Sequence, residues 1–135
     1  MRFTYTYIED NTFPGRFIYL PLINLNIGEH KIPIRCLVDS GSPITIVHSP
    51  LIVASGIIPA AGKKGALYGV GGGKITGYFH QIPVSLFGNE YVDDVFVTAE
   101  LETPYVLLGQ HGFFKKHRIT FDLSKLSFEI MLISS

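Results

Sequence analysis

The chain consists of short segments rich in β-branched and aromatic residues, separated by Gly, Pro and Asn, and this pattern limits the folds open to it. Segments of this kind at 16–27, 31–38, 43–48 and 90–100 predict strands. The turn sequences "GEH" (28–30) and "GN" (88–89) predict hairpin connections between neighbouring strands. Long windows with the apolar period of a helix are missing. The sequence therefore predicts an all-β fold, either a small barrel or a folded sheet.

Two further hairpins and two short helical segments complete this prediction. Residues 65–87 predict two strands joined by a glycine tip, and residues 118–133 predict a hairpin that turns near 123–125. Residues 110–117 are the best candidate for a short helix. Residues 49–56 predict a helical turn with Ser49 as its cap and Gly56 as its stop. Because the sequence has 135 residues and no linker composition, we expect a single domain over 1–135.

Charge and composition exclude several classes of partner. Eleven basic residues balance eleven acidic ones, so the basic footprint of a nucleic-acid-binding protein is absent. The apolar runs are broken by Pro or Asn before they reach the length of a membrane span, and the amino-terminal segment lacks the apolar centre of a signal peptide. The single cysteine, Cys36, is expected to be a buried thiol. These features predict a cytoplasmic protein that binds neither nucleic acid nor membrane, with an apolar surface that oligomerisation would cover.

Several possible chemical sites do not meet the requirements of their motifs. The stretch "GVGGGKIT" is not a phosphate-binding loop, because Ile75 follows Lys74 where Ser or Thr is needed and Tyr68 stands where the first Gly is needed. The five histidines lack the spacing and the cysteine partners of a zinc site, so we expect no metal and no cofactor, and surface or turn positions for the histidines. Asp93 and Asp94 would face opposite sides of one strand, which favours a solvated edge strand over an acid–base site.

The strongest candidate for chemistry is Asp39, in the stretch "CLVDSGSPITIV" (36–47). Apolar residues precede the acid and a β-branched strand follows the Ser-Gly turn, so the loop is expected inside the core. Burial among apolar groups disfavours a charged carboxylate. Asp39 therefore needs hydrogen-bond partners, a second group that shares its proton, or a functional role. A plain turn with an Asx-type hydrogen bond is the alternative interpretation of Asp-Ser-Gly.

At these residues the sequence resembles the retropepsin-like aspartic proteases, the half-sized relatives of the pepsin family. The resemblance runs in motif order from about Phe17 to Ile130. It includes apolar-apolar-Asp-Ser-Gly-Ser at 37–42, a glycine-rich hairpin at 69–77 in the place of the family's flap, and "VLLGQHGFFKKHRITFDLSKLSFEI" (106–130) in the place of its second hallmark. The resemblance implies the family's fold: a half-barrel with a β-hairpin flap and one short C-terminal helix.

The resemblance also implies a homodimeric aspartic endopeptidase that acts on a peptide or protein substrate. Hydrolysis by this chemistry needs two carboxylates, and Asp39 is the one aspartate here in an Asp-[Ser/Thr]-Gly setting. The second carboxylate would come from another copy across a two-fold axis, which makes Asp39 the expected catalytic residue. Ser40 would link the two active loops, Gly41 would permit the turn and Ser42 would donate a hydrogen bond to Asp39. The tip of the substrate-binding flap would be formed by Gly71, Gly72 and Gly73.

Three positions depart from the family's pattern. Viral members often carry an acid two residues beyond the active Gly, paired with an Arg, whereas Pro43 and Gln110 stand at these positions here. Cellular relatives often carry an acid where His111 stands. A rival prediction follows: a catalytically inactive dimerisation or peptide-binding module that keeps the fold and holds a peptide by strand addition.

Overall fold

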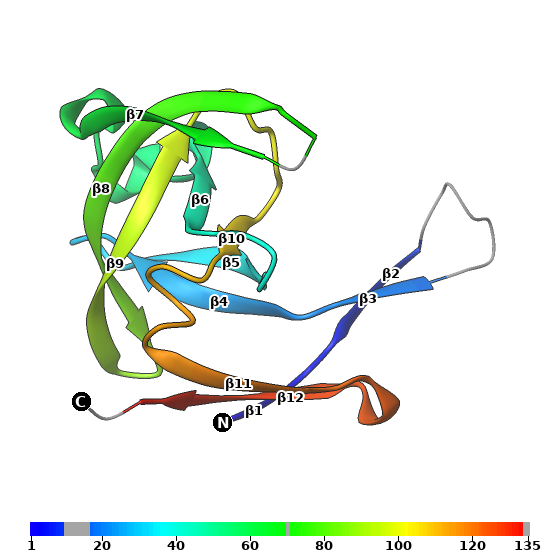
Figure 1. Cartoon of the computed structure of the whole chain (residues 1–135). Coiled ribbons are helices and arrows are strands. Elements are labelled where there is room, and N and C mark those ends of the chain that lie inside the picture. The colour runs from blue at the N-terminus through cyan, green and yellow to red at the C-terminus, as the bar shows by residue number, and fades with distance from the viewer. Residues whose placement is uncertain (10–16, 70, 134–135) are drawn as a thin grey trace.

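The computed structural model describes residues 1–9, 17–69 and 71–133 (Figure 1). In these residues the strands are β1 (Arg2–Thr4), β2 (Thr6–Glu9), β3 (Phe17–Leu20), β4 (Leu22–Ile27), β5 (Ile32–Val38), β6 (Thr45–His48), β7 (Lys63–Tyr68), β8 (Lys74–Leu86), β9 (Asn89–Thr98), β10 (Val106–Leu108), β11 (His117–Asp122) and β12 (Ser127–Leu132). The short 3₁₀ turns are η1 (Ser49–Leu51), η2 (Val53–Ser55), η3 (Pro59–Ala61) and η4 (Leu123–Lys125). The fold is all-β, as the sequence predicts.

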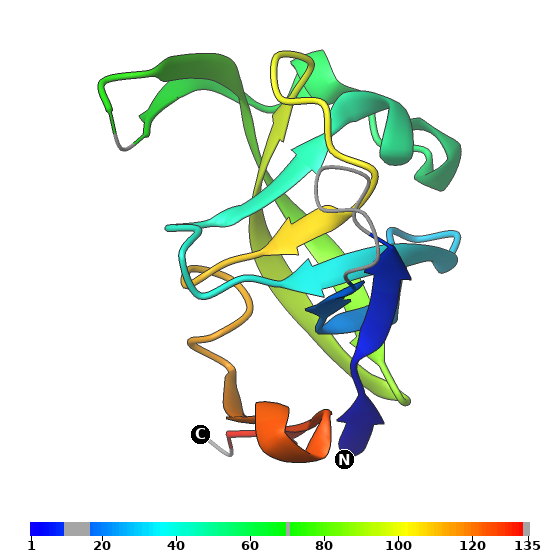
Figure 2. The ribbon, with the colours of Figure 1, turned by 90° about the vertical axis from the view of Figure 1, so that its right-hand side faces the viewer.

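The main sheet has the strand order β4-β5-β10-β6-β9-β8-β7, and an additional pairing of β4 with β8 closes it into a barrel. Within this sheet β10 runs parallel to β5, and β6 runs parallel to β9. Parallel neighbours cannot be joined by a tight turn, so these pairings bring together segments that are far apart in the sequence. Two smaller sheets, β1-β12-β11 and β2-β3, lie outside the barrel (Figures 1 and 2).

The alternation of apolar and polar residues along the strands explains where the core lies. In β4, Leu25 and Ile27 are buried, whereas Asn24 and Asn26 are exposed. Side chains from β4, β5, β6, β8, β9 and β10 of the barrel and from β12 form one hydrophobic core. Cys36 of β5 is fully buried among them, and burial raises the pKa of its thiol well above the ordinary value. The thiol is therefore an unreactive core group, as predicted.

The β8–β9 hairpin turns one residue earlier than the sequence "GN" suggests. Leu86 pairs with Asn89, which leaves Phe87 and Gly88 as the two central residues of the turn, with φ values of 49° and 82°. Two successive left-handed residues form a type I′ turn, whose twist matches that of the strands. The Phe87 ring lies 5.4 Å from the Phe3 ring, so contact with β1 helps to hold this turn.

The segment 110–117 is a run of turns followed by the start of β11, and the helix predicted for it is wrong. Two amides of this segment donate to carbonyls five residues back, and Gly112 has a φ of 92°. Such a left-handed residue cannot continue an α-helix. The helical element near the C-terminus is instead η4, which connects β11 to β12 at the predicted turn.

The helical turn predicted over 49–56 consists of η1 and η2. Gly56 ends η2 with a φ of 85°, as predicted. Ser49 is wrong as the cap, because His48 occupies the cap position of η1 and no side chain caps it. No helix in the described ranges is long and apolar enough to cross a membrane.

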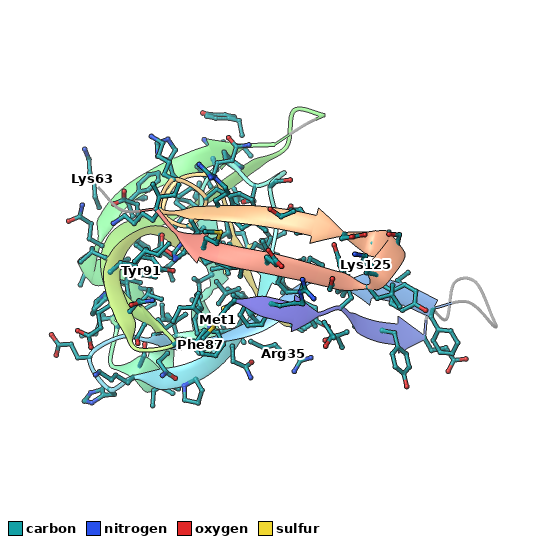
Figure 3. The ribbon with its side chains drawn as sticks, turned by 90° about the horizontal axis from the view of Figure 1, so that it is seen from below. Met1, Arg35, Lys63, Phe87, Tyr91 and Lys125 are labelled. Carbon is teal, nitrogen blue, oxygen red and sulfur yellow. The ribbon has the colours of Figure 1, made fainter. Side chains whose placement is uncertain are left out.

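The β1-β12-β11 sheet lies across one end of the molecule, and Figure 3 views it from that end. Arg2 and Glu129 form an ion pair across β1 and β12, with 3.0 Å between Nη2 and Oε1. Large apolar side chains of this region are exposed: Met1, Phe121, Leu123, Leu126, Met131 and Leu132. Exposed apolar side chains in this number are typical of a surface that contacts another protein.

Candidate active site

The segments that carry the two sequence motifs meet at one end of β10. This strand lies between β5 and β6, parallel to the first and antiparallel to the second. The loop 39–44, which joins β5 to β6, therefore passes over the end of β10 and beside the segment 109–111. Two backbone hydrogen bonds join loop and segment: Gln110 N–H to Ser42 O (2.9 Å) and His111 N–H to Pro43 O (3.0 Å). A third, from Asp39 N–H to Leu108 O (3.0 Å), joins the loop to the end of β10.

Asp39 is half-buried at the surface of the chain, and Ser40 and Gly41 beside it are exposed. The loop does not lie inside the core as predicted, because the strands end before it and the 109–111 segment supports it from one side. Oδ1 of Asp39 accepts a hydrogen bond from the Gly41 amide at 3.0 Å, which is the Asx-type turn that this sequence favours. A Cβ at Gly41 would lie 3.2 Å from the same oxygen, so a side chain there would crowd the carboxylate.

The Ser42 hydroxyl does not donate to Asp39 as predicted. It donates to the carbonyl of Ile44 at 2.6 Å, and the Ser42 side chain is buried. The Ser42 amide donates to the Asp39 carbonyl at 3.2 Å. Ser42 therefore shapes the loop through the backbone, and the carboxylate takes its hydrogen bond from Gly41 instead.

Gln110 ties the loop through its side chain as well as its backbone. Its Nε2 donates to the Ser40 carbonyl at 2.9 Å. The position at which viral members often carry an Arg thus still contacts the Asp39 loop, through a neutral hydrogen bond. Pro43, at the position of the missing acid, contributes its carbonyl to the His111 amide.

The β7–β8 hairpin projects from the barrel on the side where β5 turns into β6, as Figures 1 and 2 show from two directions. Gly71 and Gly72 have φ values of 90° and 83°, which glycine adopts without strain. A Cβ added at Gly71, Gly72 or Gly73 would meet no atom within 4 Å. The hairpin with its glycine tip is confirmed, and its closure over a substrate stays a prediction.

Comparison with known proteins finds relatives along most of the chain. The chain is 30% identical over 114 residues to DNA damage-inducible protein 1 of Saccharomyces cerevisiae, and 26% identical over 114 residues to Protein DNA-DAMAGE INDUCIBLE 1 of Arabidopsis thaliana. Each match covers 83% of this chain. Among solved structures, the fold is similar to that of EIAV protease complexed with the inhibitor HBY-793, with a TM-score of 0.53, 18% sequence identity, and coverage of 67% of this chain and 82% of that chain. The chain belongs to the retropepsin-like aspartic protease family.

This retropepsin-like chain is much shorter than its curated relatives. It spans 26% of the Saccharomyces cerevisiae protein and 27% of the Arabidopsis thaliana protein. No protein-family model matches the chain. The fold class predicted from the sequence is confirmed, with η4 as the short helical element near the C-terminus.

Asp93 lies in an environment that the sequence interpretation placed wrongly. β9 lies between β6 and β8 and is not an edge strand. Asp93 is 1% exposed, whereas Asp94 is exposed. The prediction that the two side chains face opposite sides of the strand is confirmed, and the prediction that both are solvated is wrong. Burial raises the pKa of Asp93 to about 7. The sequence does contain a sign of this burial: Asp93 is two and four residues from Val95 and Val97, and alternate residues of a strand share a face. All three side chains are buried in β9.

His117 is buried and not at the surface or in a turn as predicted. Its ring stacks on Phe113 with 4.4 Å between centroids, and its Nδ1 is 2.9 Å from the Phe113 carbonyl. Burial lowers the pKa of this imidazole. Within the described parts of the chain, no three His, Cys, Asp or Glu side chains gather as a metal site.

Proposed function

We propose that the chain is a homodimeric aspartic endopeptidase in which the Asp39 carboxyls of two copies together activate a water molecule. The observation that carries the proposal is the position of Asp39 in a retropepsin-like chain. It directly follows β5, in a loop tied to the 109–111 segment, and its neighbours Ser40 and Gly41 are exposed. A second copy can therefore reach this loop, and it would supply the carboxyl that one chain lacks.

The chemistry follows from two acids at short range. Two neighbouring carboxyls cannot both ionise easily, so the pair holds one proton between them over a range of pH. The ionised member takes a proton from water as the water attacks the scissile carbonyl carbon, and the protonated member donates to the carbonyl oxygen. The tetrahedral diol then breaks the C–N bond, and a proton passes to the leaving nitrogen. No further group is needed for the proton balance.

Exposed apolar side chains support the association of two chains. The β2-β3 ribbon exposes Tyr7, Phe17, Ile18 and Tyr19. An isolated two-stranded ribbon is marginally stable in water, so contact with a partner would stabilise it. In the proposed dimer, Ser40 would hydrogen-bond across the two-fold axis. The flap tip at Gly71 to Gly73 would close over the peptide and exclude water.

A cleavage assay on an unfolded protein substrate, run from acidic to neutral pH, tests this function. Wild type is expected to cleave, with inhibition by a statine-type transition-state mimic. Asp39→Asn is expected to lose at least about a thousandfold in rate, because it removes both members of the pair at once. Asp94→Asn makes the same change at an exposed acid and should leave the rate unchanged.

Three outcomes would reject the proposal in different ways. Cleavage that persists in Asp39→Asn excludes the mechanism. A wild-type chain that sediments as a dimer and binds peptide, yet never cleaves it, identifies the inactive peptide-binding module instead. Sedimentation at several concentrations and at acidic pH completes the test, because a monomer throughout excludes a shared site.

A further inference from the structure

A buried acid lies directly behind the segment that holds the Asp39 loop. Asp93, in the middle of β9, is 1% exposed. Its Oδ2 accepts a hydrogen bond from the hydroxyl of Thr45, the first residue of β6, at 3.4 Å. The same hydroxyl accepts a hydrogen bond from the Gly109 amide at 3.2 Å. The three residues form a continuous chain of contacts from β9 through β6 to the end of β10.

The other carboxyl oxygen packs against a second point of the same segment. Gly112 has a φ of 92°, and a Cβ at this position would overlap Oδ1 of Asp93. Within the described residues, Oδ1 has no hydrogen-bond partner. Asp93 therefore supports the 109–112 segment at both ends, through Thr45 at Gly109 and directly at Gly112.

The 109–112 segment in turn fixes the loop that carries Asp39. Gln110 donates to the Ser42 carbonyl from its backbone and to the Ser40 carbonyl from its side chain, each at 2.9 Å. Gly109 leaves no room for adjustment, because a Cβ there would lie 2.8 Å from the Ser42 carbonyl oxygen and would overlap the Ile44 backbone. A shift of this segment would move the backbone on both sides of Gly41.

We propose that Asp93 is a positioning residue of the candidate active site, which holds the 109–112 segment through Thr45 and Gly112 and thereby sets the position of the Asp39 loop. The effect of Asp93 on catalysis depends on the proposed protease function. Its role in holding the 109–112 segment does not, because that role concerns only contacts within one chain.

The surroundings of Asp93 favour its neutral form. Burial raises the pKa of Asp93 to about 7, although the Thr45 hydrogen bond acts in the opposite direction. The titratable or charged side chains around this carboxyl are Asp94, Tyr91, Cys36 and Lys116. Because the folded chain binds this proton more tightly than the unfolded chain, the contribution to stability is complete below the ordinary pKa of about 4 and is lost as pH rises through about 7. We expect ionised Asp93 to loosen the 109–112 segment.

Hydrogen exchange of backbone amides tests this role without reference to catalysis. In wild type, the protection factor of the Gly109 amide is expected to fall about tenfold between pH 6 and pH 8, as the carboxyl ionises. Asp93→Asn stays neutral and can still hydrogen-bond Thr45, so its protection factor should stay level. Asp93→Ala should lose protection at both pH values. Glu90→Ala, at an exposed acid of the same strand, is the matched control and should behave as wild type does.

Equal protection at Gly109 in wild type and Asp93→Ala would overturn the proposal. If the alanine variant does not fold, Thr45→Ser and Thr45→Val provide the comparison on an intact Asp93. Serine keeps the hydroxyl and should keep the protection, whereas valine should lose it, and equal protection in both would again overturn the proposal.

Cleavage assays on the same variants separate this inference from the proposed function. A wild-type chain that never cleaves but shows the expected exchange pattern counts against the protease and leaves the structural role of Asp93 standing. A wild-type chain that cleaves, with exchange at Gly109 insensitive to Asp93, counts against the positioning role alone.

Discussion

The loop around Asp39 and the middle of β9 around Asp93 each carry an acid beside the same barrel core, but the two acids differ in burial and in hydrogen bonding. Asp39 follows the last residue of β5, is half-buried, and accepts a hydrogen bond from the Gly41 amide. Asp93 has paired strands on both sides, is 1% exposed, and has its pKa raised by burial. In this fold, an acid at a strand end stays accessible to a partner or substrate, whereas an acid in the middle of a strand becomes an internal support.

Both regions contact Gly109, so a substitution there should have the largest effect on the free energy of unfolding. In Gly109→Ala, the new Cβ would overlap the Ile44 backbone and lie 2.8 Å from the Ser42 carbonyl oxygen. Backbone atoms cannot rotate away as a side chain can, so we expect a loss of about 3 kcal/mol in the free energy of unfolding. Urea denaturation of the purified chain measures it.

Gly73→Ala is the matched control for this substitution. A Cβ at Gly73 meets no atom within 4 Å, so the free energy of unfolding should change by less than about 0.5 kcal/mol. Equal stability of the two variants would mean that the 109–112 segment moves freely relative to the Asp39 loop, and the link between the two acids would be lost.

Local sequence patterns were enough to predict most of the strands and both motifs of this fold. The β-branched residues at 31–38 predicted β5, and the glycines at 71–73 marked the tip of the β7–β8 hairpin. The helix predicted over 110–117 does not form, because Gly112 adopts a left-handed φ of 92° that redirects the chain. Propensity could not reveal this, because the carboxyl of Asp93, on a distant strand, occupies the space that a Cβ at Gly112 would need.

Of the two acids, Asp39 was predicted from local sequence, whereas the buried position of Asp93 was not. Asp39 was found from its neighbours in sequence, since the motif is continuous. The sequence predicted a solvated edge strand around Asp93, and this was wrong because β9 pairs with β6 in parallel. That pairing joins Thr45 to Val95 across a long stretch of chain, so local sequence does not reveal it. The burial of His117 likewise depends on Tyr91 of the distant strand β9, whose ring centroid lies 5.0 Å from that of the imidazole. Long-range pairing, and not local pattern, decides which polar groups enter the core.

A change at the buried His117 should have an effect of intermediate size on stability. Burial lowers the pKa of this imidazole, so the unfolded chain binds its proton more tightly than the folded chain does. The contribution of His117 to stability is therefore complete above the ordinary pKa of about 6.5 and is lost as pH falls below it, which is opposite in sign to that of Asp93. In His117→Asn the amide can replace Nδ1 at the Phe113 carbonyl but cannot ionise. We expect lower stability at pH 8 and a smaller loss from pH 7 to pH 5 than in wild type.

Thermal or urea unfolding at several pH values measures the difference between wild type and His117→Asn. His30→Asn, at an exposed histidine, serves as the control. A difference between wild type and His117→Asn that does not change with pH would show that the buried imidazole does not resist protonation, and that the core around Phe113 admits water.

The smallest effect on stability is expected at Gln110, where it should separate positioning from folding. Gln110→Ala removes the hydrogen bond from Nε2 to the Ser40 carbonyl but keeps the backbone bond to Ser42. Because the side chain is exposed, the free energy of unfolding should fall by only about 0.5 kcal/mol. Gln81→Ala removes an exposed bond of the same kind, from Nε2 to Asp94 at 3.2 Å, and should cost a similar amount. The rate of peptide cleavage should fall several-fold in Gln110→Ala alone, since only that bond holds the Asp39 loop. Equal rates in the two variants would mean that the backbone bonds of the 109–111 segment suffice to position Asp39, and that Gln110 is no substitute for the Arg of the viral members.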